Sequence, residues 1–164
     1  KEGVGIRVLS ALLGISAVTV IRRIQMLAKD IVIPIGNYSG CYEIDEMKTY
    51  VRRKSNEYWV VSVLDRESKE VIYSTVGKRT KLVLGRAVDY ALSRGSEEIY
   101  TDNLKMYRSL IPEEFHLRRK YELNHIERKH LSLRTHLKRL SRRTICYSKS
   151  LVILWSCVMI YFLG

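Results

Sequence analysis

The sequence lacks the features that mark several common classes of protein. Its three cysteines, Cys41, Cys146 and Cys157, are widely spaced and form no CxxC pair. This argues against a disulfide framework or a zinc ribbon within these residues, and for a reducing compartment. The sequence also shows no Gly-rich phosphate loop and no Ser-His-Asp arrangement, and its four histidines lack metal-ligand spacing. These absences give no support to a secreted disulfide scaffold, a nucleotide-binding loop or a serine hydrolase.

Long apolar runs are also missing. The most apolar stretch, residues 151–163, is 13 residues long, whereas a helix that crosses a bilayer needs roughly 20. We therefore interpret this stretch as a buried terminal helix and expect no membrane partner. The sequence opens on Lys1 and a polar run rather than an apolar one, so we expect no signal peptide.

Acids are scarce relative to bases. The 164 residues include 29 Lys and Arg against 17 Asp and Glu, and the formal net charge is +12. Hydrophobic residues make up 46% of the chain, enough to form a core, so disorder is not expected. Ten of the Lys and Arg residues lie between residues 118 and 143, with only two acids among them. A charge excess concentrated in this way favours a polyanionic partner, above all the phosphate backbone of nucleic acid.

The first 30 residues predict two helices joined by a tight turn. Ser10 is a small residue four positions before Gly14, and Gly suits a turn that takes positive φ. Ser16 is placed to cap a second helix, and Val20 to lock that helix onto the first. This is the pattern of a helix-turn-helix. The face that we expect the second helix to present to DNA is formed by Ala17, Val18, Thr19, Arg22 and Arg23.

Residues 31–40 contain a Pro, two Gly, an Asn and a Ser, which indicates a linker. We therefore expect a DNA-binding domain at residues 1–35 and a second domain at residues 36–164. In the second domain, alternating apolar residues with short polar joins predict three hairpin-connected strands, after which helical and strand patterns alternate. The expected elements are strands at residues 41–51, 57–65 and 70–77, a helix at 80–95, a strand at 97–102, a short helix at 103–111, a strand at 114–121 and a long basic helix from 124 to about 143.

This order predicts an α+β or mixed α/β fold. Three antiparallel strands, a helical crossover and further strand–helix alternation describe a mixed five-stranded sheet flanked by helices. The ribonuclease H-like fold has this order of elements. We therefore expect a helix-turn-helix followed by a ribonuclease H-like core with an apolar C-terminal helix.

Glu127 is one of the two acids in the basic segment. On the predicted helix, the apolar stripe that should face the sheet is formed by Ile126, Leu133, Leu137 and Leu140. Glu127, Arg134 and Lys138 are then expected to lie together beside this stripe. Taken alone, Glu127 is explained more simply as a surface acid paired with neighbouring cations.

Two further acids change that interpretation. Asp45 lies in the middle of the first predicted strand, and Asp102 ends the fourth, at the carboxyl edge where α/β sites usually gather. If these two strands are neighbours, the acids converge, and the long helix brings Glu127 to them. Three carboxylates repel one another unless cations neutralise them, as two Mg²⁺ ions about 3.5–4 Å apart do in phosphodiester chemistry. Glu43 shares the strand face of Asp45 and is a candidate accessory acid.

Three segments resemble a known family. The segments YEIDEMKTYV, YTDNLKMYRSLI and NHIERKHLSLRTHLKRLSRRTICYSKS closely resemble the insertion sequence 1 family of bacterial DDE transposases. The segment GVGIRVLSALLGISAVTVIRRI is similar to the helix-turn-helix of the same family, so the resemblance covers nearly the whole chain. It implies a ribonuclease H-like core with an Asp-Asp-Glu triad. The triad is carried over as Asp45 in IDE, Asp102 in TDN and Glu127 in IER, with 24 residues between the last two.

The sequence departs from the family pattern at three positions outside the triad. Asn103 stands where Gly commonly follows the second Asp, and we expect it to distort the turn beside Asp102. Arg52 stands where TYVG is common, and His130 stands where Asn is common. The zinc-binding segment that often precedes the helix-turn-helix in the family has no counterpart in these residues.

The resemblance implies a DNA transposase that binds the terminal inverted repeats of its element, cleaves DNA strands and joins a 3′-hydroxyl to target DNA with two Mg²⁺ or Mn²⁺ ions. The implied partners are double-stranded DNA, as element ends and as target, and further copies of the chain in a homodimer or higher oligomer. The implied location is the bacterial cytoplasm, at the nucleoid. The DNA contacts that we expect are Thr19, Arg22, Arg23, Arg128, Arg134, Lys138 and Arg142.

Two other functions are compatible with the same residues. The first is a sequence-specific DNA-binding protein or inactive remnant, in which the three acids are incidental and binding needs no metal. The second is a structure-selective nuclease of the ribonuclease H-like fold, such as a junction resolvase, which cuts without joining and needs no end sequence.

Overall fold

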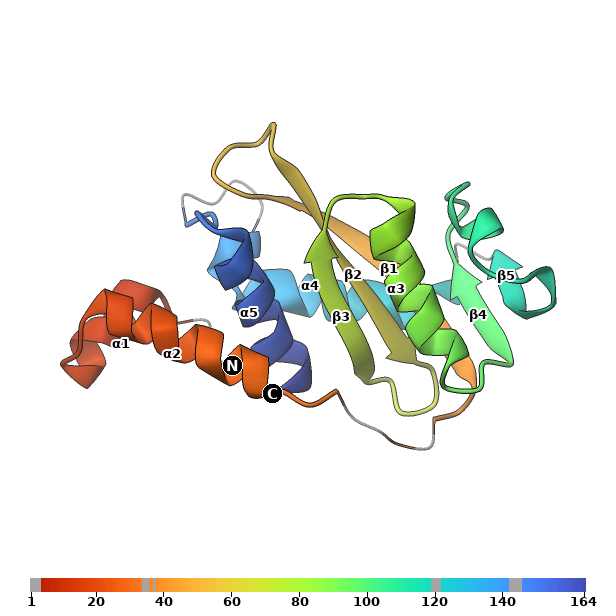
Figure 1. Cartoon of the computed structure of the whole chain (residues 1–164), viewed down its shortest axis with the longest axis horizontal. Coiled ribbons are helices and arrows are strands. Elements are labelled where there is room, and N and C mark those ends of the chain that lie inside the picture. The colour runs from red at the N-terminus through yellow and green to blue at the C-terminus, as the bar shows by residue number, and fades with distance from the viewer. Residues whose placement is uncertain (1–3, 34–35, 37, 119–121, 142–145) are drawn as a thin grey trace.

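The computed structural model describes residues 4–33, 36, 38–118, 122–141 and 146–164 (Figure 1). Five α-helices and five strands are present in these ranges. The helices are α1 (Ile6–Leu13), α2 (Ala17–Asp30), α3 (Lys81–Leu92), α4 (Asn124–His136) and α5 (Leu151–Leu163). The strands are β1 (Cys41–Tyr50), β2 (Glu57–Asp65), β3 (Val71–Gly77), β4 (Glu98–Thr101) and β5 (His116–Arg118). Short 3-10 helices are η1 (Tyr107–Ser109), η2 (Glu113–Phe115) and η4 (Lys138–Leu140).

The five strands form one mixed sheet in the order β3-β2-β1-β4-β5. The strands β1, β2 and β3 are an antiparallel meander, as the alternation of apolar residues predicted. After the α3 crossover, β4 pairs parallel to β1, and β5 pairs parallel to β4. An antiparallel meander extended by parallel strands on the β1 side is the ribonuclease H-like arrangement, so this part of the fold prediction is confirmed.

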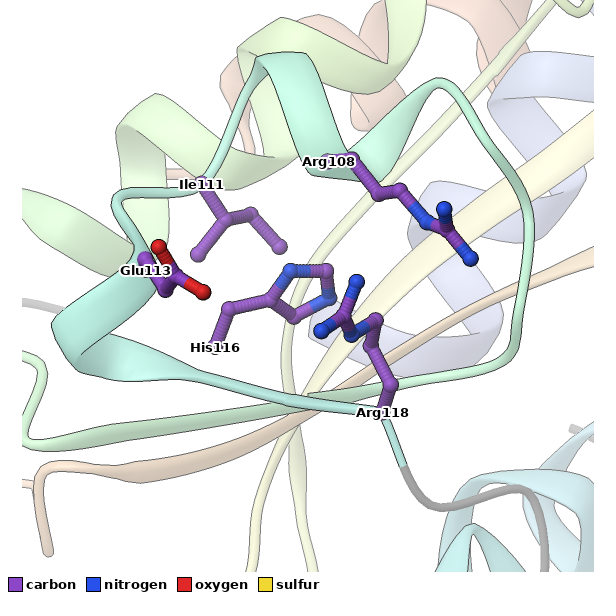
Figure 2. A pocket seen from close by; sticks show the side chains of 5 residues that line it. All are labelled: Arg108, Ile111, Glu113, His116 and Arg118. Atoms are coloured by element: carbon purple, nitrogen blue, oxygen red, sulfur yellow. The ribbon is translucent and has the colours of Figure 1, made fainter.

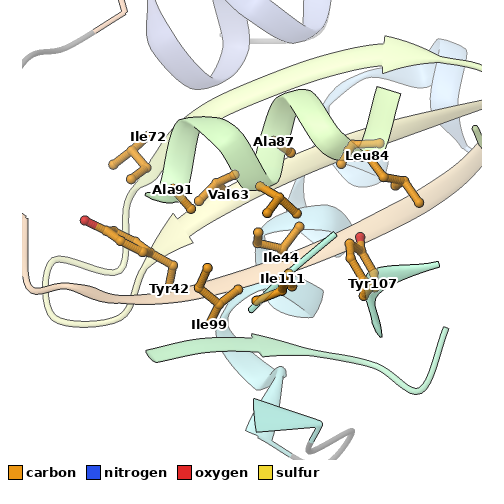
Figure 3. Close-up of a cluster of buried hydrophobic side chains, with 12 residues drawn as sticks. Tyr42, Ile44, Val63, Ile72, Leu84, Ala87, Ala91, Ile99, Tyr107 and Ile111 are labelled. Atoms are coloured by element: carbon orange, nitrogen blue, oxygen red, sulfur yellow. The ribbon is translucent and has the colours of Figure 1, made fainter. Parts of the chain in front are cut away.

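The face of the sheet that α3 covers carries the larger apolar core. Because side chains alternate along β1, Tyr42 and Ile44 point toward this face. They pack there with Val63 of β2 and with the face of α3 that carries small side chains. Figure 3 shows Ala87 and Ala91 of α3 over these strand residues. Alanines let the helix approach the sheet closely, and all of these side chains are buried. This packing fixes β1 as the rigid central strand.

The opposite face is covered by α4 and α5, with α4 behind the sheet in Figure 1. Leu133 of α4 and Leu154 of α5 are fully buried, and they pack in one cluster with Met47 of β1. The helix α5 lies between β3 and α2. The apolar run at residues 151–163 is therefore a helix packed on the domain, as predicted, and within the described residues no single helix is long and apolar enough to cross a membrane.

The two N-terminal helices meet at a tight turn. Gly14 takes φ 63°, a conformation that favours glycine, and the Ser16 side chain accepts a hydrogen bond from the Thr19 N–H. Val20 is buried at 2% exposure. The axes bend by 106° across the turn, close to the 90–120° that helix-turn-helix pairs adopt. The turn chemistry agrees with the sequence, while DNA binding by this pair stays a prediction, as does the domain boundary at residue 35.

The basic helix is shorter than predicted. It ends at His136, because Leu137 leaves the helical region with φ −93° and ψ 94°, and the chain continues as η4. The change of direction lets Leu140 reach the core beside α5, where it is 6% exposed. A straight helix would have carried Leu140 along the α4 axis instead. Lys138 is therefore not stacked with Arg134 on one helix, and the prediction of a helix to about residue 143 was wrong at its end; residues 142–143 are not described.

Two smaller predictions also need correction. The short helix expected at residues 103–111 is reduced to η1, and the strand expected at 114–121 begins with η2 and becomes β5 only at His116. The helix at 80–95 ends at Leu92, although Gly95 does take a left-handed φ of 72°. The segment from η1 to β5 lies at the edge of the sheet, beside β4. The apolar periodicity of a segment does not indicate such packing, so it could not predict these bounds.

Arg52 adopts φ 67°, in the region that favours glycine. This conformation turns the chain out of β1 into the β1–β2 connection, and the Arg52 N–H donates to the Ser148 carbonyl. The positive φ at this position therefore explains why the family pattern has Gly here. Asn103, by contrast, lies outside the positive-φ region, so its backbone conformation does not require glycine.

Candidate functional site

Asp45 projects from the central strand β1 toward α4, and its side chain is 21% exposed. Its Oδ2 atom lies 3.3 Å from Nδ1 of His130. Burial acts to raise the pKa of Asp45, but the hydrogen bond and charge of His130, with smaller contributions from the Glu46 N–H and Arg79, outweigh it and lower the pKa. Asp45 is therefore held as a carboxylate.

His130 is buried in α4, with 5% exposure, and uses its second nitrogen as well. Its Nε2 atom lies 3.2 Å from Oγ of Ser62, which stands directly opposite Asp45 on β2. The Ser62 hydroxyl also lies 3.1 Å from that of Ser74 on β3. A line of polar groups therefore crosses three strands beneath α4. The carboxylate can only accept, so Nδ1 of His130 is the donor to Asp45.

Glu43 lies on the same face of β1 and anchors the first turn of α4. Its side chain is fully buried, its Oε2 accepts from the Ile126 N–H at 2.9 Å, and its Oε1 lies 2.8 Å from Nδ1 of His125. Arg66 adds a longer ion pair at 3.6 Å. A carboxylate at a helix N-terminus satisfies free N–H groups and favours the helix dipole. His125 is therefore part of this anchor.

Glu127 follows Ile126 in the first turn of α4 and is exposed. It precedes His130 by three residues, so the two share one face of the helix. Glu127 therefore lies one turn from the residue that contacts Asp45. The anchor at Glu43 fixes the position of this turn on the sheet, since the Ile126 amide is the group that it binds.

Asp102 comes directly after β4 and is half-buried. Its Oδ1 accepts from the Leu104 N–H at 2.8 Å, which fixes the carboxylate at the strand end. Because β4 pairs with β1, the predicted adjacency of the first and fourth strands is confirmed. Burial raises the pKa of Tyr107 well above its usual value, and the charges of Glu46, Asp45 and Asp102 add to that rise.

The structure places Asp45 and Asp102 on neighbouring strands and Glu127 in the first turn of α4, without assembling the three acids into a set of metal ligands. Across the described ranges, no group of three or more Asp, Glu, His or Cys side chains is arranged to hold a metal ion. Asp45 is engaged by His130, and Glu127 is exposed. The identity of the three acids as a catalytic triad therefore stays a prediction.

Sequence reasoning missed the role of Glu46. This carboxylate is buried on the α3 face, where Arg79 binds it through Nε at 2.9 Å and the Tyr107 hydroxyl donates at 2.8 Å. Burial raises the pKa of Glu46, and the charge of Asp102 adds to the effect, although Arg79 and Tyr107 oppose it. The sequence did contain a signal for this role. Glu46 is two residues after Ile44 and four after Tyr42, so its side chain points to the same buried face of the strand, where an acid needs a cation as partner.

The predicted DNA contacts are spread over two regions. Arg22 and Arg23 are exposed on α2 and Arg128 is exposed on α4, whereas Thr19 is exposed but engages Ser16 through its hydroxyl. Arg134 is half-buried and donates to the Lys48 carbonyl at 3.4 Å. Lys138 is exposed in η4, while Arg142 lies outside the described residues.

Comparison with solved structures finds matches of low identity and low TM-score. One is a structure of a simian T-cell lymphotropic virus intasome bound to a PP2A regulatory subunit, with 19% identity and a TM-score of 0.47 over 76% of this chain and 53% of that one. Another is the HTLV-2 integrase catalytic core with magnesium, with 18% identity and a TM-score of 0.42 over 63% of this chain and 70% of that one. The fold assignment rests on strand order and pairing rather than on these likenesses.

Comparison of sequences is more specific. An InsB protein of insertion element IS1 from Escherichia coli K12 is 38% identical over 111 residues, which cover 67% of this chain and 66% of that protein. The InsB protein of Shigella sonnei is 37% identical over 67% of this chain and 84% of its own length. The chain thus spans about two thirds of the E. coli relative. The IS1 transposase family model matches residues 39–163, which contain the whole sheet and the three acids. The chain therefore belongs to the IS1 transposase family.

Proposed function

We propose that the chain is a DNA transposase that binds the ends of its element and cleaves and joins DNA strands. The observation that supports this most directly is the placement of Asp45. It is held as a carboxylate on the central strand of a ribonuclease H-like sheet, next to β4 and in contact with His130 of α4. An ionised acid at this position, in a chain of a transposase family, is the starting point for phosphodiester chemistry.

The three acids fit a divalent metal by donor chemistry. Asp45, Asp102 and Glu127 offer carboxylate oxygens, which Mg²⁺ and Mn²⁺ prefer. A metal pair bound there would neutralise the phosphodiester and activate a water or a 3′-hydroxyl. The protein's own contribution is to keep Asp45 ionised through His130 and to fix the first turn of α4 through Glu43.

The cations supply the proposed DNA contacts. Thr19, Arg22 and Arg23 on α2 are the proposed end-binding residues. Arg134, Lys138 and Arg142 are the proposed backbone contacts, and Arg128 completes the set. Pairing of two element ends implies at least a dimer on DNA, and the proposed substrate implies action at the bacterial nucleoid.

A second candidate function is DNA binding without catalysis. The observation that favours it is the contact between Asp45 and His130, which occupies the carboxylate that a metal would need. In this case α1, α2 and the basic residues keep their roles, and Glu127 is an ordinary exposed acid.

A strand-transfer assay separates the two candidates. The protein is incubated with a labelled pre-cleaved element end and a plasmid target, with Mn²⁺ or with EDTA. The test variants are Asp45→Asn and Glu127→Gln, and the matched control is Glu67→Gln, an exposed acid in the β2–β3 turn. We expect joined product that requires metal, is lost by 10²-fold or more in both test variants and is unchanged in the control.

The other outcomes are equally informative. End-specific binding without any joined product, and with no effect of metal, supports the DNA-binding candidate. Equal activity in Glu127→Gln and Glu67→Gln contradicts the proposed role of Glu127. Cleavage without joining on substrates that lack element ends points to a structure-selective nuclease.

A further inference from the structure

A small cationic pocket lies at the β5 edge of the sheet, apart from the acids described above. We call it the edge pocket. Its volume is about 190 Å³, and its lining is formed by Arg108, Ile111, Glu113, His116 and Arg118. Figure 2 shows the guanidinium group of Arg118 next to the His116 ring, while the Arg108 side chain extends past the ring on the other side of the pocket. Pockets that take drug-sized ligands measure about 300–1,000 Å³, so the edge pocket suits a single chemical group.

The charges in the pocket select an anion. Two arginines and one acid line it, and the structure gives Arg108, Arg118 and Glu113 no ion pair with any described residue. A guanidinium presents a planar set of donors that matches a phosphate or carboxylate group. The arginines come from η1 and β5, so the fold brings together two cations against the single acid Glu113.

His116 is oriented so that it can join these donors. The buried Thr101 hydroxyl donates to the Asp102 carbonyl at 2.9 Å, so it must accept from Nε2 of His116, which lies 2.7 Å away. The Nε2 atom therefore carries hydrogen, and Nδ1 is the remaining ring nitrogen for a ligand. Burial lowers the pKa of His116, and the charges of Arg118 and Arg108 lower it further. A bound anion would offset those charges and favour a proton on Nδ1.

The pocket is connected to the acid at the end of β4. Thr101 pairs with Arg118 in the β4–β5 register, and its hydroxyl touches both His116 and the backbone of Asp102. Alternation along β4 places Thr101 and Asp102 on opposite faces of the strand end. A DNA strand that reaches Asp102 can therefore pass around the short β5 edge and place a neighbouring phosphate near the arginines.

We propose that the edge pocket binds one backbone phosphate of a DNA strand. The inference rests on the proposed function for its choice of DNA over free phosphate. The site lies on η1, η2 and β5 rather than on α2 or α4, where the sequence located the DNA contacts. Its role is to position the strand relative to Asp102, without participation in bond breaking.

Two measurements test the proposal. The first follows the ring signals of His116 by NMR while inorganic phosphate is added at constant pH and ionic strength. The second measures duplex affinity against salt for Arg108→Gln, Arg118→Gln and the control Arg86→Gln, an exposed arginine on α3. We expect phosphate to shift His116 in wild type and not in Arg118→Gln. We also expect each pocket variant to reduce the slope of log K against log salt by about 1, with no change in Arg86→Gln.

The outcomes separate the sources of phosphate. A His116 shift with unchanged DNA slopes identifies a site for free phosphate and overturns the DNA assignment. No His116 shift, with slopes equal to that of Arg86→Gln, overturns the site altogether. The readouts use binding only, so they are unaffected if the Asp45→Asn and Glu127→Gln experiment shows no catalysis. Circular dichroism confirms that each variant is folded.

Discussion

His130 uses both ring nitrogens inside the fold, one for Asp45 and one for Ser62. The arrangement has two consequences at the residue scale. It keeps Asp45 ionised despite burial. It also gives hydrogen-bond partners to Asp45 and Ser62, whose burial beneath α4 without partners would destabilise the fold. The family pattern has Asn at this position, and an amide can replace only part of this set.

We predict that His130→Ala destabilises the protein by about 1–3 kcal/mol and that His130→Asn costs roughly 1 kcal/mol, because the amide retains one polar contact. A carboxylate whose folded pKa is lowered contributes its stability above its unfolded pKa, near 3.9, and loses it as pH falls through the folded pKa. The loss in His130→Ala should therefore be full at neutral pH and shrink below about pH 4. Urea unfolding at several pH values measures this, and an equal loss at pH 7 and pH 3 would contradict it.

Residue-scale contacts were the hardest features to predict from the sequence. The acids at positions 45, 102 and 127 could be selected because strand ends, helix faces and a family resemblance all point to them. The contact of Asp45 with His130 could not be selected, because it depends on how α4 lies across β1 and β2. The pairing of Glu46 with Arg79 depends in the same way on the approach of α3.

At the element scale, β1 organises the site through both of its faces. One face packs on α3, and the other holds α4 through Glu43 and Asp45. Strands and helices with regular apolar alternation were predicted nearly to the residue, as β2 (Glu57–Asp65) and α5 (Leu151–Leu163) show. The end of α4 was not, because Leu140 reaches the core by a turn that has no local signal.

We predict that Glu43→Ala destabilises the protein by about 3 kcal/mol, because it leaves the buried Ile126 amide without an acceptor and removes one partner each of His125 and Arg66. Glu43→Gln retains an acceptor and should cost about 1–2 kcal/mol. Hydrogen exchange of the Ile126 and Glu127 amides reports the loosened first turn. The control is Glu70→Gln, which removes an exposed pair with Lys129 on the same helix and should cost less than about 1 kcal/mol. Unchanged protection of Ile126 in Glu43→Ala would contradict the anchoring role.

For the whole molecule, basic residues lie on α2, on α4, at the β5 edge and in the β1–β2 turn rather than in one segment alone. The sequence located the first two regions because their basic residues are close in the chain. The edge pocket was missed, because Arg108 and Arg118 are ten positions apart and meet only after η1 and η2 fold back along β5.

We predict that duplex binding depends steeply on salt. With six or more phosphate contacts, affinity should fall by roughly 10³ or more between 50 and 200 mM salt. Fluorescence anisotropy with a labelled duplex measures the slope, and Arg22→Gln with Arg23→Gln should reduce it by nearly 2 if both contact phosphate. The control is Lys54→Gln in the β1–β2 turn. A shallow slope in wild type would contradict a binding mode based on the backbone.

The position of α5 has a consequence for the order in which the molecule matures during synthesis. This helix separates α2 from β3, so the N-terminal pair has its supporting surface only after the last helix is in place. On the ribosome, α1 and α2 emerge first but wait for residues 151–163 before they can dock. A chain interrupted before α5 would leave α1 and α2 without this support and the sheet without one of its covering helices. The N-terminal pair and the sheet are thereby joined only in a chain whose translation has passed residue 163.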